Sequence, residues 1–221
     1  MPKKYFLLII LTIILVFVCN CSDGNSGYTT WTLESTRFPY QAPEDYPRYT
    51  FEYPSSFMES PPSDALAPVT VWLIRKQFGA DSWDDLEENK NPPSQAELED
   101  FIEWEHAQFQ VYINSDKSWD PFAMAPSEEQ PGSLSENEST QVLEVSRIVI
   151  DGITAERTTK RYYTKQRLYG AEAWRIYIRT EFEYCRFNCG ITMDAPWGKR
   201  DIMTEYYNHI LETFQILERV S

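Results

Sequence analysis

The sequence predicts an α+β fold, an antiparallel sheet covered by helices. Runs of alternating or β-branched residues occupy both halves of the chain, and in the second half they follow one another through short turns. Two amphipathic stretches, 94–110 and 200–214, have helical spacing; one separates the two groups of strands and the other follows them. Strands grouped in this way around two helices are typical of the α+β class.

The first strands are expected before residue 80. Aromatic residues alternate with polar ones over Arg48–Tyr53, which predicts a strand that ends at Pro54. Val69–Lys76 is rich in β-branched and apolar residues and is predicted to be the second strand. Seven prolines between residues 39 and 68 indicate that these strands are approached and joined by turns.

The clearest helix signal begins at Ser94. Ser94 and Glu97 have the spacing of a capping box, in which the serine hydroxyl accepts from a backbone amide and the glutamate reaches back to the cap. Apolar residues then predict a helix to about Gln110, and the second amphipathic stretch predicts a last helix from about Arg200. Residues 114–140 lack periodicity, so we expect a mobile loop there, because long structureless loops are uncommon and usually mobile or functional.

Four antiparallel strands are expected between that loop and the last helix. Val142–Ile150 and Ile153–Tyr163 flank Asp151-Gly152, which is a strong signal for a two-residue hairpin. Two further strands are expected over residues 174–183 and 187–193, each with apolar residues at alternate positions. The apolar face of the first of these carries Trp174, Ile176, Ile178, Thr180 and Phe182.

The N-terminus has the organisation of an export signal. Lys3 and Lys4 form a positively charged region, and Phe6–Val18 is apolar apart from Thr12. This run is short of the ~20 residues that a helix needs to span a bilayer. We therefore expect the chain to be exported and to face outside the cytoplasm.

Two cysteines follow the apolar run directly, before a short polar stretch. This arrangement resembles a bacterial lipoprotein signal, whose cysteine carries the lipid. Cys21 is the expected acceptor and Cys19 the alternative, since Asn20 is nearer than Val18 to the small residue that such signals prefer before the cysteine. Ordinary secretion and an uncleaved signal anchor are the other outcomes, and all of them give an extracytoplasmic domain.

The 221 residues are expected to form one domain, at ~100–200 residues per domain. Residues 1–21 are the signal with its lipid-acceptor cysteine or anchor, and residues 22–45 are a tether and proline-rich lead-in. Residues 46–219 form the single α+β domain, with the mobile loop at about 114–140. We expect a monomer.

The charge balance excludes one class of ligand. Twenty basic residues against 34 acidic residues give a net charge of −14, and removal of the signal with its two lysines leaves −16. Because non-specific nucleic-acid binding depends on positive charge, a polynucleotide partner is not expected. The charge is unevenly distributed, since residues 22–146 hold 24 acids and six bases whereas residues 147–200 hold 11 bases and six acids.

Within that basic segment, alternation places Arg175, Tyr177 and Arg179 on the strand face opposite Trp174 and Ile178. One hypothesis is that this outer face binds an anionic partner, either lipid headgroups near the anchor or an acidic protein. The alternative is that the face pairs with the acidic front half of the domain or is simply solvated, as most charged surfaces are.

Outside the signal, Cys185 and Cys189 are the remaining cysteines. Their spacing is a poor metal signature without accompanying histidines, and it is not the spacing of a redox pair. Outside the cytoplasm a local disulfide is permitted, so a structural disulfide and two buried thiols are both open interpretations.

Catalytic and cofactor signatures are weak. The sequence has no nucleophile-elbow motif, no phosphate loop and no dinucleotide fingerprint, and its two histidines, His106 and His209, fall in predicted helices. The acidic cluster of residues 81–88 lacks calcium-loop spacing and is expected to be a solvated face near a helix start. We therefore expect no cofactor and no metal.

Three motifs resemble those of the PsbP-like superfamily. They are Tyr49-Thr-Phe-Glu-Tyr-Pro54 at the start, Ile148-Val-Ile-Asp-Gly-Ile-Thr-Ala155 in the middle and Glu205–Phe214 at the end. The chain is most similar to the exported lipoproteins of that group, the DcrB-type branch, over roughly residues 46–219. The resemblance implies a PsbP-like α/β/α sandwich and a non-enzymatic binding or assembly role, and it carries over no functional residue.

The sequence thus favours a non-catalytic extracytoplasmic lipoprotein, held at the cell membrane by its lipid anchor, that binds a ligand or an envelope protein. The alternative is an envelope hydrolase that uses carboxylates or histidines in an aromatic cleft. The two differ in one expectation: an enzyme needs a deep cavity where His106, His209 or paired acids converge with raised pKa values.

Overall fold

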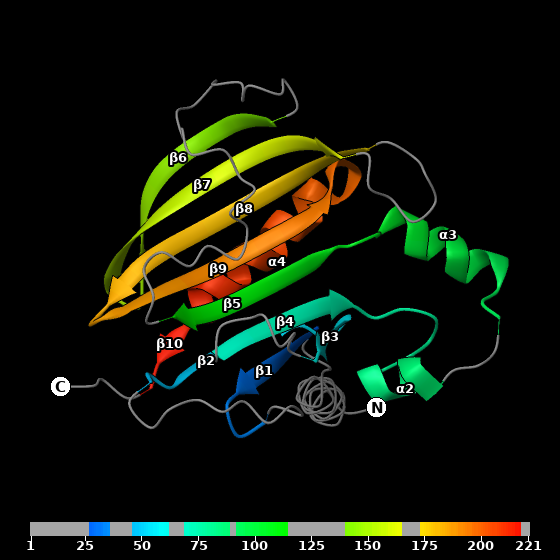
Figure 1. Ribbon diagram of the computed structural model, residues 1–221, viewed down its shortest axis with the longest axis horizontal. Helices are drawn as coiled ribbons and strands as arrows, with labels where there is room; N and C mark the ends of the chain where they lie inside the picture. The colour runs from blue at the N-terminus through cyan, green and yellow to red at the C-terminus, as the bar shows by residue number, and fades with distance from the viewer. Residues whose placement is uncertain are drawn as a thin grey trace, which may run out of the picture.

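The computed structural model describes residues 27–35, 46–61, 69–88, 92–114, 140–164 and 173–217. Its elements are labelled in Figure 1. They are β1 (Tyr28–Thr32), β2 (Tyr49–Pro54), β3 (Phe57–Ser60), β4 (Val69–Arg75), α2 (Trp83–Glu88), α3 (Gln95–Glu103), β5 (Gln108–Asn114), β6 (Thr140–Ile150), β7 (Ile153–Thr164), β8 (Ala173–Tyr184), β9 (Phe187–Pro196), the 3₁₀ turn η1 (Trp197–Lys199), α4 (Arg200–Thr213) and β10 (Gln215–Ile216).

The strands form two antiparallel sheets. The large sheet has the order β3-β4-β5-β9-β8-β7-β6, and the small sheet has the order β1-β2-β10. The β6–β7 hairpin turns at Asp151 and Gly152, both of which have positive φ, as a two-residue turn of this kind requires. The predicted fold class is confirmed for the antiparallel sheet.

The core lies between α4 and the sheets. α4 runs across one face of the large sheet (Figure 1), and its inward side carries Met203, Tyr207, Ile210 and Leu211. Apolar residues from β4, β5, β8 and β9 meet this helix, together with Trp31 and Phe51 of the small sheet. Burying such side chains stabilises the domain by ~1.5–3 kcal/mol each.

The opposite face of the large sheet is polar, yet its central side chains are also buried. A row across the strands joins Gln110 of β5, Thr192 of β9, Arg179 of β8 and Thr158 of β7. Gln110, Thr192 and Thr158 are all below a tenth exposed. In this sheet, therefore, the alternation of polar and apolar residues does not mean that the polar face is exposed to solvent.

Cover by helices is confirmed only in part. Within the described residues, α4 is the helix that lies along a sheet face, while α2 and α3 lie at one end of the sheet (Figure 1). The predicted signal, residues 1–21, lies outside the described residues, and so do residues 22–26 and 36–45 of the predicted tether and lead-in. Within that predicted tether, residues 28–32 form β1, which pairs with β2. The expected loop also lies outside the described residues, apart from its end residues Asn114 and Thr140.

The predicted C-terminal end of the first helix was wrong. The helix that begins at the Ser94 cap ends at Glu103 rather than at Gln110, and Gln108–Asn114 is a central strand. Both parts of the capping box are present, so the helix start was predicted correctly. The helix stops early because β5 pairs on both sides, with β4 and β9, and this pairing outweighs the local helical pattern.

Candidate functional site

The three residues proposed as an outer binding face do not form an exposed surface. Arg175 is 4% exposed and Tyr177 is 6% exposed, and the Arg179 side chain pairs with Glu181 at 3.4 Å. The hypothesis of an anion-binding face on Arg175, Tyr177 and Arg179 is therefore corrected, because the polar face of this sheet is buried. Trp174, expected in the core, is 38% exposed instead.

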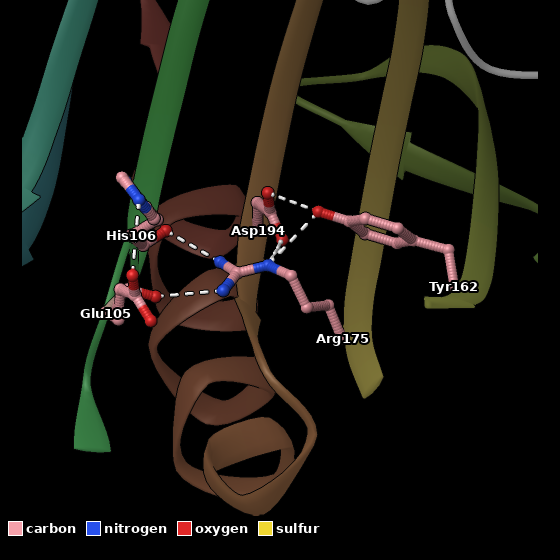
Figure 2. A network of polar contacts seen from close by, with 5 residues as sticks. All are labelled: Glu105, His106, Tyr162, Arg175 and Asp194. Atoms are coloured by element: carbon pink, nitrogen blue, oxygen red, sulfur yellow. Dashed lines mark hydrogen bonds and ion pairs between the residues drawn. The ribbon is translucent and has the colours of Figure 1, made fainter. Parts of the chain in front are cut away.

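Arg175 is the centre of a buried polar network that joins four elements (Figure 2). Its Nε lies 2.9 Å from Oδ1 of Asp194 on β9 and 3.1 Å from the hydroxyl of Tyr162 on β7. The Tyr162 hydroxyl donates to the second oxygen of Asp194 at 2.7 Å. The two terminal nitrogens of Arg175 donate to the carbonyl oxygens of Glu105 and His106, both at 2.9 Å.

This network has a structural task. Glu105 and His106 form the turn between α3 and β5, and His106 has a positive φ of 56°. Such a backbone is costly for a residue other than glycine, so the surrounding contacts must hold it. Arg175 supplies two charge-assisted hydrogen bonds to carbonyl oxygens of that turn. Its guanidinium is thus already engaged and does not face a ligand.

The pKa shifts in the network follow from burial and pairing. Burial raises the pKa of the Asp194 carboxyl above its ordinary value, and the Arg175 guanidinium and Tyr162 hydroxyl oppose the shift. Burial alone would lower the pKa of Arg175, but the Asp194 carboxylate and the Tyr162 hydroxyl together more than offset it, so that pKa is raised. The pKa of the Tyr162 hydroxyl is also raised, mainly by burial and in second place by the charge of Asp194.

The two histidines pair with different carboxylates. His106 Nε2 lies 3.7 Å from Oε1 of Glu105, its neighbour in the turn. His209, on α4, lies 2.9 Å from Oε2 of Glu52 and stacks on the Tyr28 ring, with the ring centroids 3.7 Å apart. His209 thus joins the helix to β1 and β2, which is a structural contact between elements.

Neither histidine lines the Arg75-containing cavity or either of two others in the described part of the chain. Asp194, whose carboxyl pKa is raised, does not line them either. Glu97 does line one cavity, but hydrogen bonds from the Ser94 hydroxyl and backbone lower its pKa. The convergence that a hydrolase requires is therefore not found among these cavities.

Cys185, in the β8–β9 turn, and Cys189, on β9, are thiols and do not form a disulfide. Cys185 is exposed and Cys189 is buried. Burial raises the pKa of the Cys189 thiol from its ordinary value to about 12, so this sulfur is a poor nucleophile. The sequence left open a structural disulfide or two buried thiols. The structure contains two thiols, of which only Cys189 is buried.

The acidic cluster is used locally. Asp81 forms an ion pair with Lys76 at 3.0 Å, and Asp85 accepts a hydrogen bond from the Ser82 hydroxyl at 2.7 Å. No group of three or more acidic, histidine or cysteine side chains with the geometry of a metal site occurs in the residues described. The interpretation of an acidic face at a helix start fits α2, whose first turn contains Asp84 and Asp85.

A site that the sequence reasoning missed lies at the end of the sheet near α3. Here cations lie over tryptophan rings in two groups, which together we call the aromatic–cation end. Trp104 has Arg75 and Lys199 over it, each 4.6 Å from the ring centroid. The members of the aromatic–cation end are Arg75, Trp104, Arg161, Trp174, Trp197, Lys199 and Arg200.

The second group is centred on Arg161 of β7. Its guanidinium carbon lies 4.2 Å from the Trp174 ring centroid and 4.5 Å from the Trp197 ring centroid. The two groups are joined through η1, which contains both Trp197 and Lys199. Contacts of this kind contribute ~0.5–2 kcal/mol each, depending on how far the cation is desolvated.

One sequence signal could have indicated this end. Two of its three tryptophans, Trp174 and Trp197, lie at the limits of predicted elements rather than within them, and both are followed closely by cations, in Trp174-Arg175 and Trp197-Gly-Lys-Arg200. An amphipathic aromatic ring at an element boundary has one apolar side and one wet side, as tryptophan commonly has at interfaces. The pairing of each ring with its cation was not predictable, because the contacts join distant segments.

A cavity of about 470 Å³ opens beside this end. It lies between α3 and the turn that follows β4, where Phe78 and Gly79 both have positive φ. We call it the Arg75 cavity. Its lining is mostly apolar, and Phe78 and Phe101 form an aromatic pair within it, with ring centroids 5.3 Å apart.

The expected lipid acceptors, Cys21 and its alternative Cys19, lie outside the described residues. In the part of the chain that the structure covers, no helix has the length and apolar character to cross a membrane. Lipidation at Cys21 therefore stays a prediction.

Comparison of this chain with known proteins gave matches among solved structures. No family model matches the sequence, and no curated protein matches it. Among solved structures, the chain is similar to LpqN of Mycobacterium tuberculosis, described as involved in cell envelope biogenesis, with 13% identity, coverage of 88% of this chain and 92% of that one, and a TM-score of 0.46.

The chain is also similar to cyanobacterial PsbP (CyanoP) of Synechocystis sp. PCC 6803, with 10% identity, coverage of 88% and 95%, and a TM-score of 0.44. A third similar structure is the Ran-binding protein Mog1p of Saccharomyces cerevisiae, with 6% identity, coverage of 77% and 90%, and a TM-score of 0.40. A PsbP protein is thus among the similar structures, and placement in the DcrB-type branch stays a prediction. At these identities the similarity does not extend to ligand, partner or activity.

Proposed function

We propose that this chain is an exported, lipid-anchored binding or assembly module whose recognition surface is the aromatic–cation end. The observation that carries the proposal is the clustering of three tryptophans with four cations at one end of the domain. Tryptophan and arginine are the residue types most enriched among energetically dominant contacts at interfaces. Trp174 is 38% exposed, so a large aromatic surface is available to a partner.

The position of Gly27 supports an anchored role for this end. The carbonyl oxygen of Gly27, the first described residue, accepts a hydrogen bond from the Ser55 amide. The carbonyl oxygen of Ser56, which follows Ser55, accepts one from the Lys76 amide. Lys76 follows Arg75, which lies over Trp104. If Cys21 carries the lipid, an extended chain from Cys21 to Gly27 spans at most about 20 Å. The aromatic–cation end would then lie close to the membrane surface.

The polar groups that could have indicated catalysis have other tasks. Arg175 and Asp194 hold a turn, and His209 links α4 to the small sheet. Binding rather than turnover is therefore the function that the described geometry favours.

The anchor is tested by mass spectrometry of the mature N-terminus and by membrane fractionation. We expect an acylated Cys21, release of Cys21→Ala from the membrane, and retention of Cys19→Ala. A mature N-terminus without lipid, or unchanged retention of Cys21→Ala, would overturn the anchoring part of the proposal.

The recognition surface is tested by photocrosslinking in intact cells, with a benzophenone amino acid in place of Trp174. The matched control has it in place of Val149, which is 70% exposed and belongs to β6. We expect a discrete adduct from position 174 that weakens when Arg161→Glu is added, and no such adduct from position 149. Equal labelling at both positions, or no effect of Arg161→Glu, would contradict a specific surface.

A further inference from the structure

The Arg75 cavity contains a guanidinium with unused hydrogen-bonding capacity. Arg75 is the last residue of β4, and its side chain is about one quarter exposed. Trp104 lies against its face at 4.6 Å. Among the described residues, no side chain accepts a hydrogen bond from its guanidinium, and its buried Nε has no acceptor. An arginine has five N–H donors, so this group can still bind an anion through its edge.

The nearest carboxylate does not satisfy this guanidinium. Asp100 Oδ1 lies 3.9 Å from a terminal nitrogen of Arg75, which is beyond hydrogen-bond distance, and the Asp100 side chain is 51% exposed. The other acids of the lining have partners of their own. Glu97 is engaged by the Ser94 cap and Asp81 by Lys76.

The rest of the lining selects for an apolar body. Phe78 and Phe101 form an aromatic pair, and Ala80 and Ala96 add small apolar walls. The cavity has a volume of about 470 Å³ and a mostly apolar surface, which are the size and character of a small-molecule site. Its charged lining residues are Arg75, Lys76, Asp81, Glu97 and Asp100, and Lys76 is paired with Asp81, so Arg75 is the cation left for a ligand. The three acids disfavour a dianion such as a phosphate monoester, because each adds repulsion.

We propose that the Arg75 cavity binds an organic monocarboxylate with an apolar body, the carboxylate on the Arg75 edge and the body against Phe78 and Phe101. A fatty-acyl carboxylate and the C-terminus of a peptide that ends in an apolar residue share this chemistry. The inference deepens the proposed binding function and rests on it, and it names the ligand class for the cavity beside the aromatic–cation end.

The test is a saturation-transfer NMR titration on the protein purified from membranes into lipid nanodiscs, with empty nanodiscs as the blank. Hexanoate represents the acyl source and N-acetylphenylalanine the peptide terminus. Their neutral counterparts are hexanamide and N-acetylphenylalaninamide. We expect at least one acid to bind roughly ten- to a hundredfold more tightly than its amide, because a charge-assisted hydrogen bond is lost in the amide.

Two variants separate the carboxylate contact from the cavity itself. Arg75→Gln should weaken acid binding roughly ten- to a hundredfold and abolish the preference for the acid. Its control is Arg48→Gln, since Arg48 forms an exposed ion pair with Glu34 outside the cavity. Ala96→Phe should fill the cavity from the exposed first turn of α3 and prevent binding, while the adjacent Gln95→Phe, outside the lining, should not.

Each result supports or overturns the inference. Preference for hexanoate assigns the acyl source, preference for N-acetylphenylalanine assigns the peptide terminus, and equal binding assigns the shared chemistry. Binding of neither acid, equal binding of acid and amide, or unchanged binding in both Arg75→Gln and Ala96→Phe overturns it. The crosslink from position 174 and the acylation of Cys21 do not depend on the cavity, so they report on the proposed function separately.

Discussion

The ring of Tyr112 lies directly over the backbone of Gly190. A Cβ placed on Gly190 would be 2.2 Å from Cζ of Tyr112, a distance that no real side chain tolerates. The two residues are register partners on β5 and β9, and the Tyr112 hydroxyl continues to Glu181 Oε1 on β8 at 3.0 Å. The absence of a side chain at Gly190 therefore allows a tyrosine to cross to the next strand.

Gly190→Ala should destabilise the domain. Overpacking of a rigid interior costs about 1–3 kcal/mol, and we expect the upper part of that range because Tyr112 is fully buried. The free energy of unfolding in urea measures it. Gly198→Ala is the matched control, since nothing lies within 4 Å of its added Cβ. Equal stability of the two variants would contradict the packing described here.

Removal of either partner of the Arg175–Asp194 pair should be strongly destabilising. Arg175→Gln or Asp194→Asn leaves a buried group without its counter-charge, which typically costs about 3–5 kcal/mol. The double variant should cost less than the two single variants together, because the uncompensated charge is gone. Urea unfolding of all three tests this. Arg48→Gln, in an exposed pair, should change stability by only about 0–1 kcal/mol.

The two thiols should react at very different rates. Cys185 is exposed, whereas burial raises the pKa of Cys189 to about 12, so alkylation of the folded protein should modify Cys185 first. Mass spectrometry of peptides after a short iodoacetamide pulse measures the order. Comparable labelling of both cysteines in the folded state would be incompatible with this burial.

The same thiol has a predictable effect on alkaline stability. A pKa raised in the folded state gives a contribution that is complete below the unfolded value near 9 and is lost as the pH rises toward about 12. The stability of the wild-type protein should therefore fall more steeply between these values than that of Cys189→Ala. Parallel pH profiles would show that Cys189 ionises equally in both states.

His209 should control the attachment of β1. The stacked contact with Tyr28 and the hydrogen bond with Glu52 are both lost in His209→Ala. We expect amide hydrogen exchange in β1 to accelerate about tenfold, since an aromatic pair contributes ~0.5–1.5 kcal/mol. His106→Asn is the control because it changes the other histidine and tolerates its positive φ. If exchange in β1 accelerated in His106→Asn and not in His209→Ala, the attachment of β1 would depend on His106 rather than on His209.

Local signals predicted the elements that local chemistry determines. Asp151-Gly152 formed the expected hairpin, and Ser94 and Glu97 formed the expected cap. The strand over Gln108–Asn114 was not predicted, because its strand character comes from partners on both sides that are distant in sequence.

The candidate site was less predictable, and for a related reason. Arg175 was expected at the surface because alternate positions of a strand normally divide into a wet side and a dry side. Here both sides are buried, and Arg175 is used to hold the Glu105–His106 turn. The tryptophans were visible in the sequence, but Arg161 comes to Trp197 only through the sheet topology.

The hydrogen bonds from Arg175 to the Glu105 and His106 carbonyls have a consequence for recognition. Trp104 directly precedes these two residues, so its backbone is tied to strand β8 before any partner arrives. A binding surface that is already ordered loses little conformational entropy when it is engaged. Under the proposed function, the buried arginine would contribute to affinity without touching a ligand, by keeping the aromatic–cation end preorganised.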